Sequence, residues 1–69
     1  MSETVKVIEL VGTSTESWEQ AAQNALEHAD QTLENITGME VQSQTASVDD
    51  GQLSSYKTTV HVAFELQSR

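Results

Sequence analysis

The chain has 69 residues, a formal net charge of -8, and neither cysteine nor proline, so we expect one small domain over residues 1–69 that forms no disulfide. Three basic residues against eleven acidic ones disfavour nucleic acid as a partner, because its phosphates would be repelled. No apolar run is long enough to span a membrane and the N-terminus lacks a secretion signal, so we expect a soluble, cytoplasmic protein without a membrane partner.

The first predicted element is a strand over residues 5–11. Its β-branched residues favour extended structure, and apolar side chains fall on both of its faces. One face carries Val5, Val7, Glu9 and Val11, and the other carries Lys6, Ile8 and Leu10. We expect one face to pack on a helix and the other to contact a neighbour. Gly12 is expected to break the strand.

The only segment with helical periodicity runs from Thr13 to Ile36. Its apolar residues recur at steps of three, four and seven, which predicts one apolar stripe along a helix: Trp18, Ala22, Ala25, Leu26, Ala29, Leu33 and Ile36. Thr13 and Glu16 fit a capping box, so the helix is predicted to begin near Ser14. Gly38 is the predicted stop signal.

Two further strands follow the helix. Residues 39–48 are expected to form a strand, although its pattern is weaker because the segment is rich in Gln, Ser and Thr. Met39 and Val41 mark one face, and Ala46 and Val48 lie on the other. Asp49-Asp50-Gly51 predicts a hairpin turn, because aspartate and glycine tolerate positive φ.

The last strand, residues 53–66, shows the clearest alternation in the chain. Its apolar face is predicted to cover the helix stripe: Tyr56, Thr58, Val60, Val62, Phe64 and Leu66. Its other face is left for a partner, a cavity or a ligand.

These elements predict an α+β fold of β-α-β-β order. A helical crossover makes the first two strands parallel and the hairpin reverses the third, so placing the third strand in the middle gives a three-stranded antiparallel sheet wrapped around one helix. Both edge strands then lack a partner. A lone chain of this size buries only about 60% of its unfolded surface, so we expect it to associate with further copies.

The sequence offers little sign of catalysis, and we predict that the protein is not an enzyme. Carboxylates at Glu9, Glu40 and Glu65 are expected to be solvated, and His28 and His61 have no partner at metal-ligand spacing. Asp49-Asp50-Gly51 lacks the further oxygen ligands of a calcium loop, so the turn interpretation is preferred. Trp18 is expected in the core or at a subunit contact.

Several motifs together resemble the dodecin family over nearly the whole chain. They are VIELVGTS at residues 7–14, SWEQAA at 17–22, Glu40-Val41, YKT at 56–58 and VHVAFEL at 60–66. The resemblance implies the strand order derived above, a hollow homododecamer, and storage of flavins such as riboflavin, FMN or lumichrome between symmetry-related tryptophans.

Two positions depart from the flavin-binding members that the chain resembles. Gly38 stands where those members carry the stacking tryptophan, and Lys57 stands where they carry a glutamine that hydrogen-bonds the flavin ring. The resemblance thus implies weak flavin binding here. SWEQAA and the missing tryptophan are similar to the calcium-dodecin subgroup, which leaves a shell with an ion-binding (calcium or another cation) or structural role as the alternative.

Overall fold

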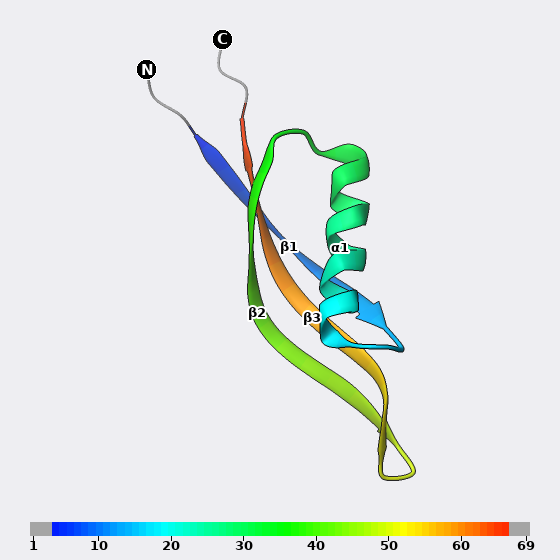
Figure 1. Cartoon of the computed structure of the whole chain (residues 1–69). Coiled ribbons are helices and arrows are strands. Elements are labelled where there is room, and N and C mark those ends of the chain that lie inside the picture. The colour runs from blue at the N-terminus through cyan, green and yellow to red at the C-terminus, as the bar shows by residue number, and fades with distance from the viewer. Residues whose placement is uncertain (1–3, 67–69) are drawn as a thin grey trace.

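The computed structural model describes residues 4–66, in which three strands and one helix follow one another as β1, α1, β2 and β3 (Figure 1). Their bounds are Val5–Ser14 for β1, Trp18–Thr32 for α1, Ile36–Asp49 for β2 and Gln52–Glu65 for β3. The outermost residues of the predicted domain, 1–3 and 67–69, lie outside the described part. Within residues 4–66, no helix has the length and apolar character that a membrane crossing requires.

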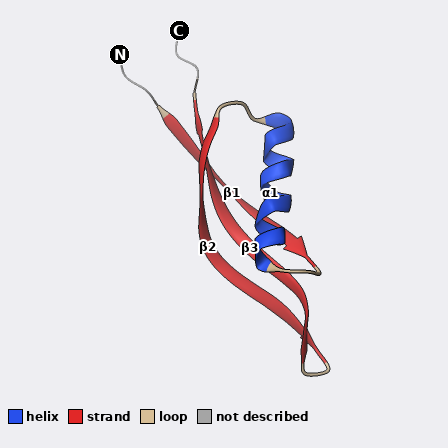
Figure 2. Cartoon of the chain, in the orientation of Figure 1, coloured by secondary structure: helices blue, strands red, loops and turns tan. Residues whose placement is uncertain are grey.

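The sheet has the predicted order, with β3 in the centre and antiparallel to both neighbours. The pairing of β1 with β3 extends without interruption from Val5 opposite Glu65 to Ser14 opposite Tyr56. α1 lies across one face of this twisted sheet, and the β2–β3 hairpin projects beyond the helix (Figures 1 and 2). The predicted α+β fold is therefore confirmed.

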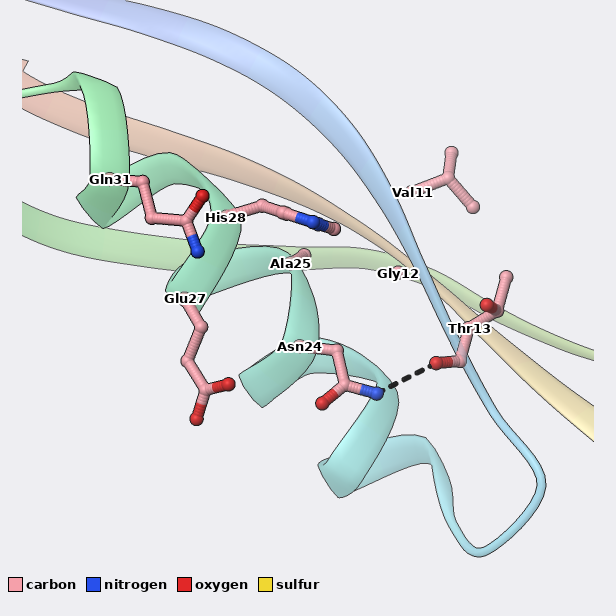
Figure 3. A pocket seen from close by; sticks show the side chains of 8 residues that line it. All are labelled: Val11, Gly12, Thr13, Asn24, Ala25, Glu27, His28 and Gln31. Carbon is pink, nitrogen blue, oxygen red and sulfur yellow. Dashed lines mark hydrogen bonds between the residues drawn. The ribbon is translucent and has the colours of Figure 1, made fainter.

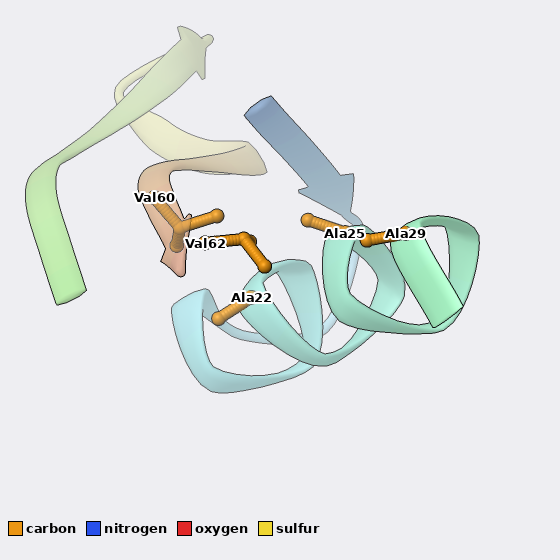
Figure 4. Close-up of a cluster of buried hydrophobic side chains, with 5 residues drawn as sticks. All are labelled: Ala22, Ala25, Ala29, Val60 and Val62. Carbon is orange, nitrogen blue, oxygen red and sulfur yellow. The ribbon is translucent and has the colours of Figure 1, made fainter. Parts of the chain in front are cut away.

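The core lies between α1 and the central strand. Small side chains of the helix stripe face the apolar row of β3 (Figure 4): Ala22, Ala25, Ala29, Val60 and Val62. Ile8 and Leu10 of β1 pack against this cluster, as predicted for one face of the first strand. Alanines on the helix permit a close approach to the sheet, which places the helix backbone directly over β1 and β3.

The predicted break at Gly12 is wrong, because β1 continues through this residue to Ser14. Gly12 is buried, and a Cβ atom built on it would collide with the backbone carbonyl of Ala21 and touch Ala25 Cβ at 3.0 Å. Glycine is thus required by the contact between strand and helix, not by the end of a strand.

The helix also begins and ends at other residues than predicted. Ser17 is the N-cap, and its hydroxyl accepts a hydrogen bond from the Gln20 amide at 2.9 Å. The helix ends at Thr32, and Asn35 takes the left-handed conformation with φ of 63°. Gly38 therefore does not stop the helix. It lies inside β2, which begins at Ile36.

β2 is longer than predicted and contains a bulge between Val41 and Ser43. The extra residue changes the alternation of side chains. As a result Ala46 faces the same side as Met39 and Val41, contrary to the prediction, since these three lie opposite Tyr56, Val62 and Val60 of β3.

The predicted hairpin turn is confirmed. Asp50 and Gly51 both have positive φ, 54° and 77°, as a two-residue hairpin loop of type I′ requires.

Candidate functional site

The face of the sheet that points away from α1, here called the outer face, is the surface left free by the fold. On β1 it carries Val5, Val7 and Val11, whose side chains are 50%, 53% and 59% exposed. On β3 it carries residues of the opposite alternation to the buried Thr58, Val60 and Val62. Such an exposed apolar row is unusual in a monomer and marks an interaction surface.

Gly38 lies on this outer face, opposite Ala63 of β3 and next to a register shift that follows Ile36. No atom lies within 4 Å of the position a Cβ atom would take. The surface is therefore open at this position, and the glycine supplies no side chain that a flat ligand would stack on.

Lys57 lies on the same face of β3, between Thr13 of β1 and Thr45 of β2. Its side chain is exposed. Lys57 lies six positions along β3 from Ala63, the partner of Gly38, which corresponds to about 20 Å at the rise of an extended strand. The structure thus places both predicted site residues on one face but does not bring them together within one chain.

A third feature of the outer face was not predicted. His61 Nε2 donates a hydrogen bond to Glu9 Oε2 across the β1–β3 pair, at 3.1 Å. The side chains are 33% and 62% exposed, respectively. On the other side of His61 its register partner in β2 is Glu40. Glutamate thus flanks the histidine on both neighbouring strands. The other two candidates from the sequence lie elsewhere. His28 is on α1, and Glu65 lies near the end of β3, opposite Val5 of β1.

Trp18 is partly buried at the first turn of α1, as predicted for a core or contact residue. Its ring meets Tyr56 edge to face with a centroid distance of 4.9 Å, and its indole N–H donates to the carbonyl of Thr45 at 2.8 Å. The tryptophan thus joins the start of the helix to the β2–β3 hairpin.

Two pockets flank the helix. One, of about 350 Å³, lies between β1 and α1, where Asn24 and His28 are directed from the helix toward the strand (Figure 3). The Asn24 amide donates to the carbonyl of Thr13 at 2.9 Å. The other pocket lies beside Leu26 and Ile36. Neither pocket is lined by Gly38 or Lys57, so the two predicted site residues belong to the open outer face.

Comparison with known proteins places this geometry in a family. Residues 4–67 match the model of the dodecin family. The protein named calcium dodecin from Mycobacterium tuberculosis is 36% identical over 62 residues, which cover 90% of this chain and 87% of the relative.

Solved structures agree with the described fold. The tt0972 protein from Thermus thermophilus superposes with a TM-score of 0.94 at 32% identity, covering 99% of this chain and 100% of the other. The dodecin from Streptomyces davaonensis gives a TM-score of 0.91 at 35% identity, again covering 99% and 100%.

Proposed function

This chain belongs to the dodecin family, and on that premise we propose that it forms a closed homododecamer that binds and stores a small ligand in the cytoplasm without catalysis. The exposed valines of β1 and the two unpaired sheet edges support assembly. Neighbouring copies would cover this apolar surface and thereby supply the stability that a lone chain of this size lacks. Sedimentation at micromolar concentration tests the assembly, and a particle of 7.6 kDa would refute it.

Flavin is the expected ligand class of the family, and we propose that this chain binds riboflavin, FMN or lumichrome only weakly. The observation that carries this proposal is the open position at Gly38. Stacking an isoalloxazine ring on an indole buries a large flat surface and adds about 0.5 to 1.5 kcal/mol beyond that burial. A glycine contributes neither.

Lys57 weakens the site in a second way. Its ammonium donates hydrogen bonds but accepts none, so it fails to pair with the imide N–H of the flavin ring as a glutamine amide does. Its charge must also lose water when a stacked ring covers it. Since Gly38 and Lys57 lie about 20 Å apart in one chain, they act on the same flavin only if different copies contribute them, which links this proposal to assembly.

Titration of riboflavin and lumichrome, followed by quenching of flavin fluorescence, tests the ligand proposal. We expect the Gly38→Trp, Lys57→Gln double variant to bind at least about a hundredfold more tightly than the unmodified protein, since stacking worth a few kcal/mol converts at about 1.4 kcal/mol per tenfold. Gly38→Ala with Lys57→Gln is the matched control, because it restores the amide without the ring. Submicromolar binding by the unmodified protein would contradict the proposal.

The second candidate is a shell with an ion-binding or structural role. It is favoured by the similarity to the M. tuberculosis calcium dodecin and by the net charge of -8. Calorimetric titration with Ca²⁺ distinguishes it from flavin storage: saturable Ca²⁺ binding by a protein that purifies colourless supports it, and the absence of binding leaves only the structural role.

A further inference from the structure

Lys57 points to the outer face, but its neighbours in the sheet contact the helix on the other side. The residues before and after it on β3, Tyr56 and Thr58, are directed toward α1, because successive side chains of a strand alternate between the two faces. Thr58 is fully buried and Tyr56 is partly buried. Across the β2–β3 pair, Thr45 is the register partner of Lys57.

Trp18 holds each of these three neighbours by a separate contact. Thr58 Oγ1 donates a hydrogen bond to the backbone carbonyl of Trp18 at 2.8 Å. The indole N–H of Trp18 donates to the carbonyl of Thr45, also at 2.8 Å. The Tyr56 ring meets the indole edge to face at a centroid distance of 4.9 Å. One residue therefore fixes the chain on both sides of Lys57 and on the strand beside it.

These contacts lie where the covered part of the sheet becomes the projecting hairpin (Figure 1). Trp18 is the first residue of α1, whereas Leu53 near the hairpin tip is 51% exposed. A two-stranded hairpin is only marginally stable alone in water. The direction of the backbone at Lys57 therefore depends on how firmly the base of the hairpin is held, and Trp18 supplies that support.

We propose that Trp18 is a positioning residue for the ligand contact at position 57. It lies on the helix side of the sheet and acts through Tyr56, Thr58 and Thr45, which set the direction in which the side chain at position 57 reaches a ligand on the outer face. A polar group binds well only when packing and hydrogen bonds behind it hold its geometry. This inference rests on the proposed ligand contact at position 57.

Site-directed spin labelling tests the positioning without any ligand. The chain has no cysteine, so Lys57→Cys carries one label, used at a labelling ratio low enough to keep labels on neighbouring copies apart. We expect the line shape of an ordered strand, and a narrower line when Trp18→Phe removes the hydrogen bond to Thr45. Thr58→Val removes the other hydrogen bond and keeps the side-chain shape. It should narrow the line too, and it replaces Trp18→Phe if that variant does not fold.

A label at Glu65→Cys is the matched control. Glu65 lies on the same face at the other end of β3, and its line shape should not change with Trp18→Phe. An unchanged line at position 57 in both Trp18→Phe and Thr58→Val would overturn the positioning role. Equal narrowing at positions 57 and 65 would also overturn it, because the substitution would then loosen the whole sheet.

Titration of riboflavin into the Gly38→Trp, Lys57→Gln double variant measures the consequence for binding. Adding Trp18→Phe should weaken the affinity about tenfold, whereas adding Tyr56→Phe, which keeps the ring contact, should not. Unchanged affinity with Trp18→Phe would overturn the role in ligand binding. If the double variant binds no flavin, the ligand proposal fails by itself, and the spin-label line shapes still decide whether Trp18 positions residue 57.

Discussion

Gly12 is the residue on which the contact between strand and helix depends most directly. Any side chain there meets the Ala21 carbonyl and the Ala25 side chain, and the Ala21 carbonyl belongs to the helix backbone, which moves only if the whole helix moves. We predict that Gly12→Ala lowers the free energy of unfolding by about 3 kcal/mol or more. Thermal or denaturant unfolding of the purified variant measures this loss.

Gly38→Ala is the control for that experiment, because the same methyl group enters open space at this position. Its stability should stay within about 0.5 kcal/mol of the unmodified protein. Equal unfolding curves for the two alanine variants would show that α1 moves away from β1 at little cost. The contact between strand and helix would then not require a glycine at position 12.

At the scale of elements, Trp18 fixes the start of α1 to the projecting hairpin. Trp18→Phe keeps an aromatic ring near Tyr56 but removes the hydrogen bond to the Thr45 carbonyl. We predict a loss of about 1 kcal/mol in stability and faster hydrogen exchange in the hairpin than in β1. Tyr56→Phe keeps both rings and the indole hydrogen bond, so it should change hydrogen exchange less. Identical exchange in the unmodified protein and Trp18→Phe would contradict this role.

The order and pairing of the elements were predictable because alternation and helical periodicity are strong in β3 and α1. The residues at which the elements begin and end were not predictable, because the sequence contains more than one pattern that fits a helix start or a helix end. Thr13 and Glu16 fit a capping box, but so do Ser17 and Gln20, and the long pairing of β1 with β3 through Ser14 selects the second. Asn35, not a glycine, takes the left-handed conformation after the helix.

Which residues lie on the outer face was predictable in part, but the contacts between them were not, because these contacts join distant parts of the sequence. Gly38 and Lys57 were found through resemblance, and alternation correctly assigned Lys57 and His61 to the same face of β3. The contact between His61 and Glu9, which lie 52 positions apart in the sequence, depends on the exact register of β1 and β3. A shift of one residue would send one of these side chains to the core, and spacing along the chain carries no information on that register.

At the scale of the whole molecule, charge opposes the proposed assembly. Each chain carries a net charge of -8, and on α1 the described residues of the last turn include no basic side chain to offset its acids. Closing twelve such chains into one shell brings like charges together, and this repulsion destabilises the compact particle. Apolar burial on the outer face of β1 has to exceed it.

Salt should therefore stabilise the particle. The Debye length falls from about 10 Å at 0.1 M to about 3 Å at 1 M, so repulsion between chains is screened while apolar burial is retained. We predict that the melting temperature of the assembly rises between roughly 0.05 and 2 M NaCl, the range over which screening changes most. KCl over the same range is the control, because screening depends on ionic strength and not on the choice of monovalent cation. A melting temperature that falls steadily with salt would show that attractive ion pairs, not apolar contacts, hold the copies together.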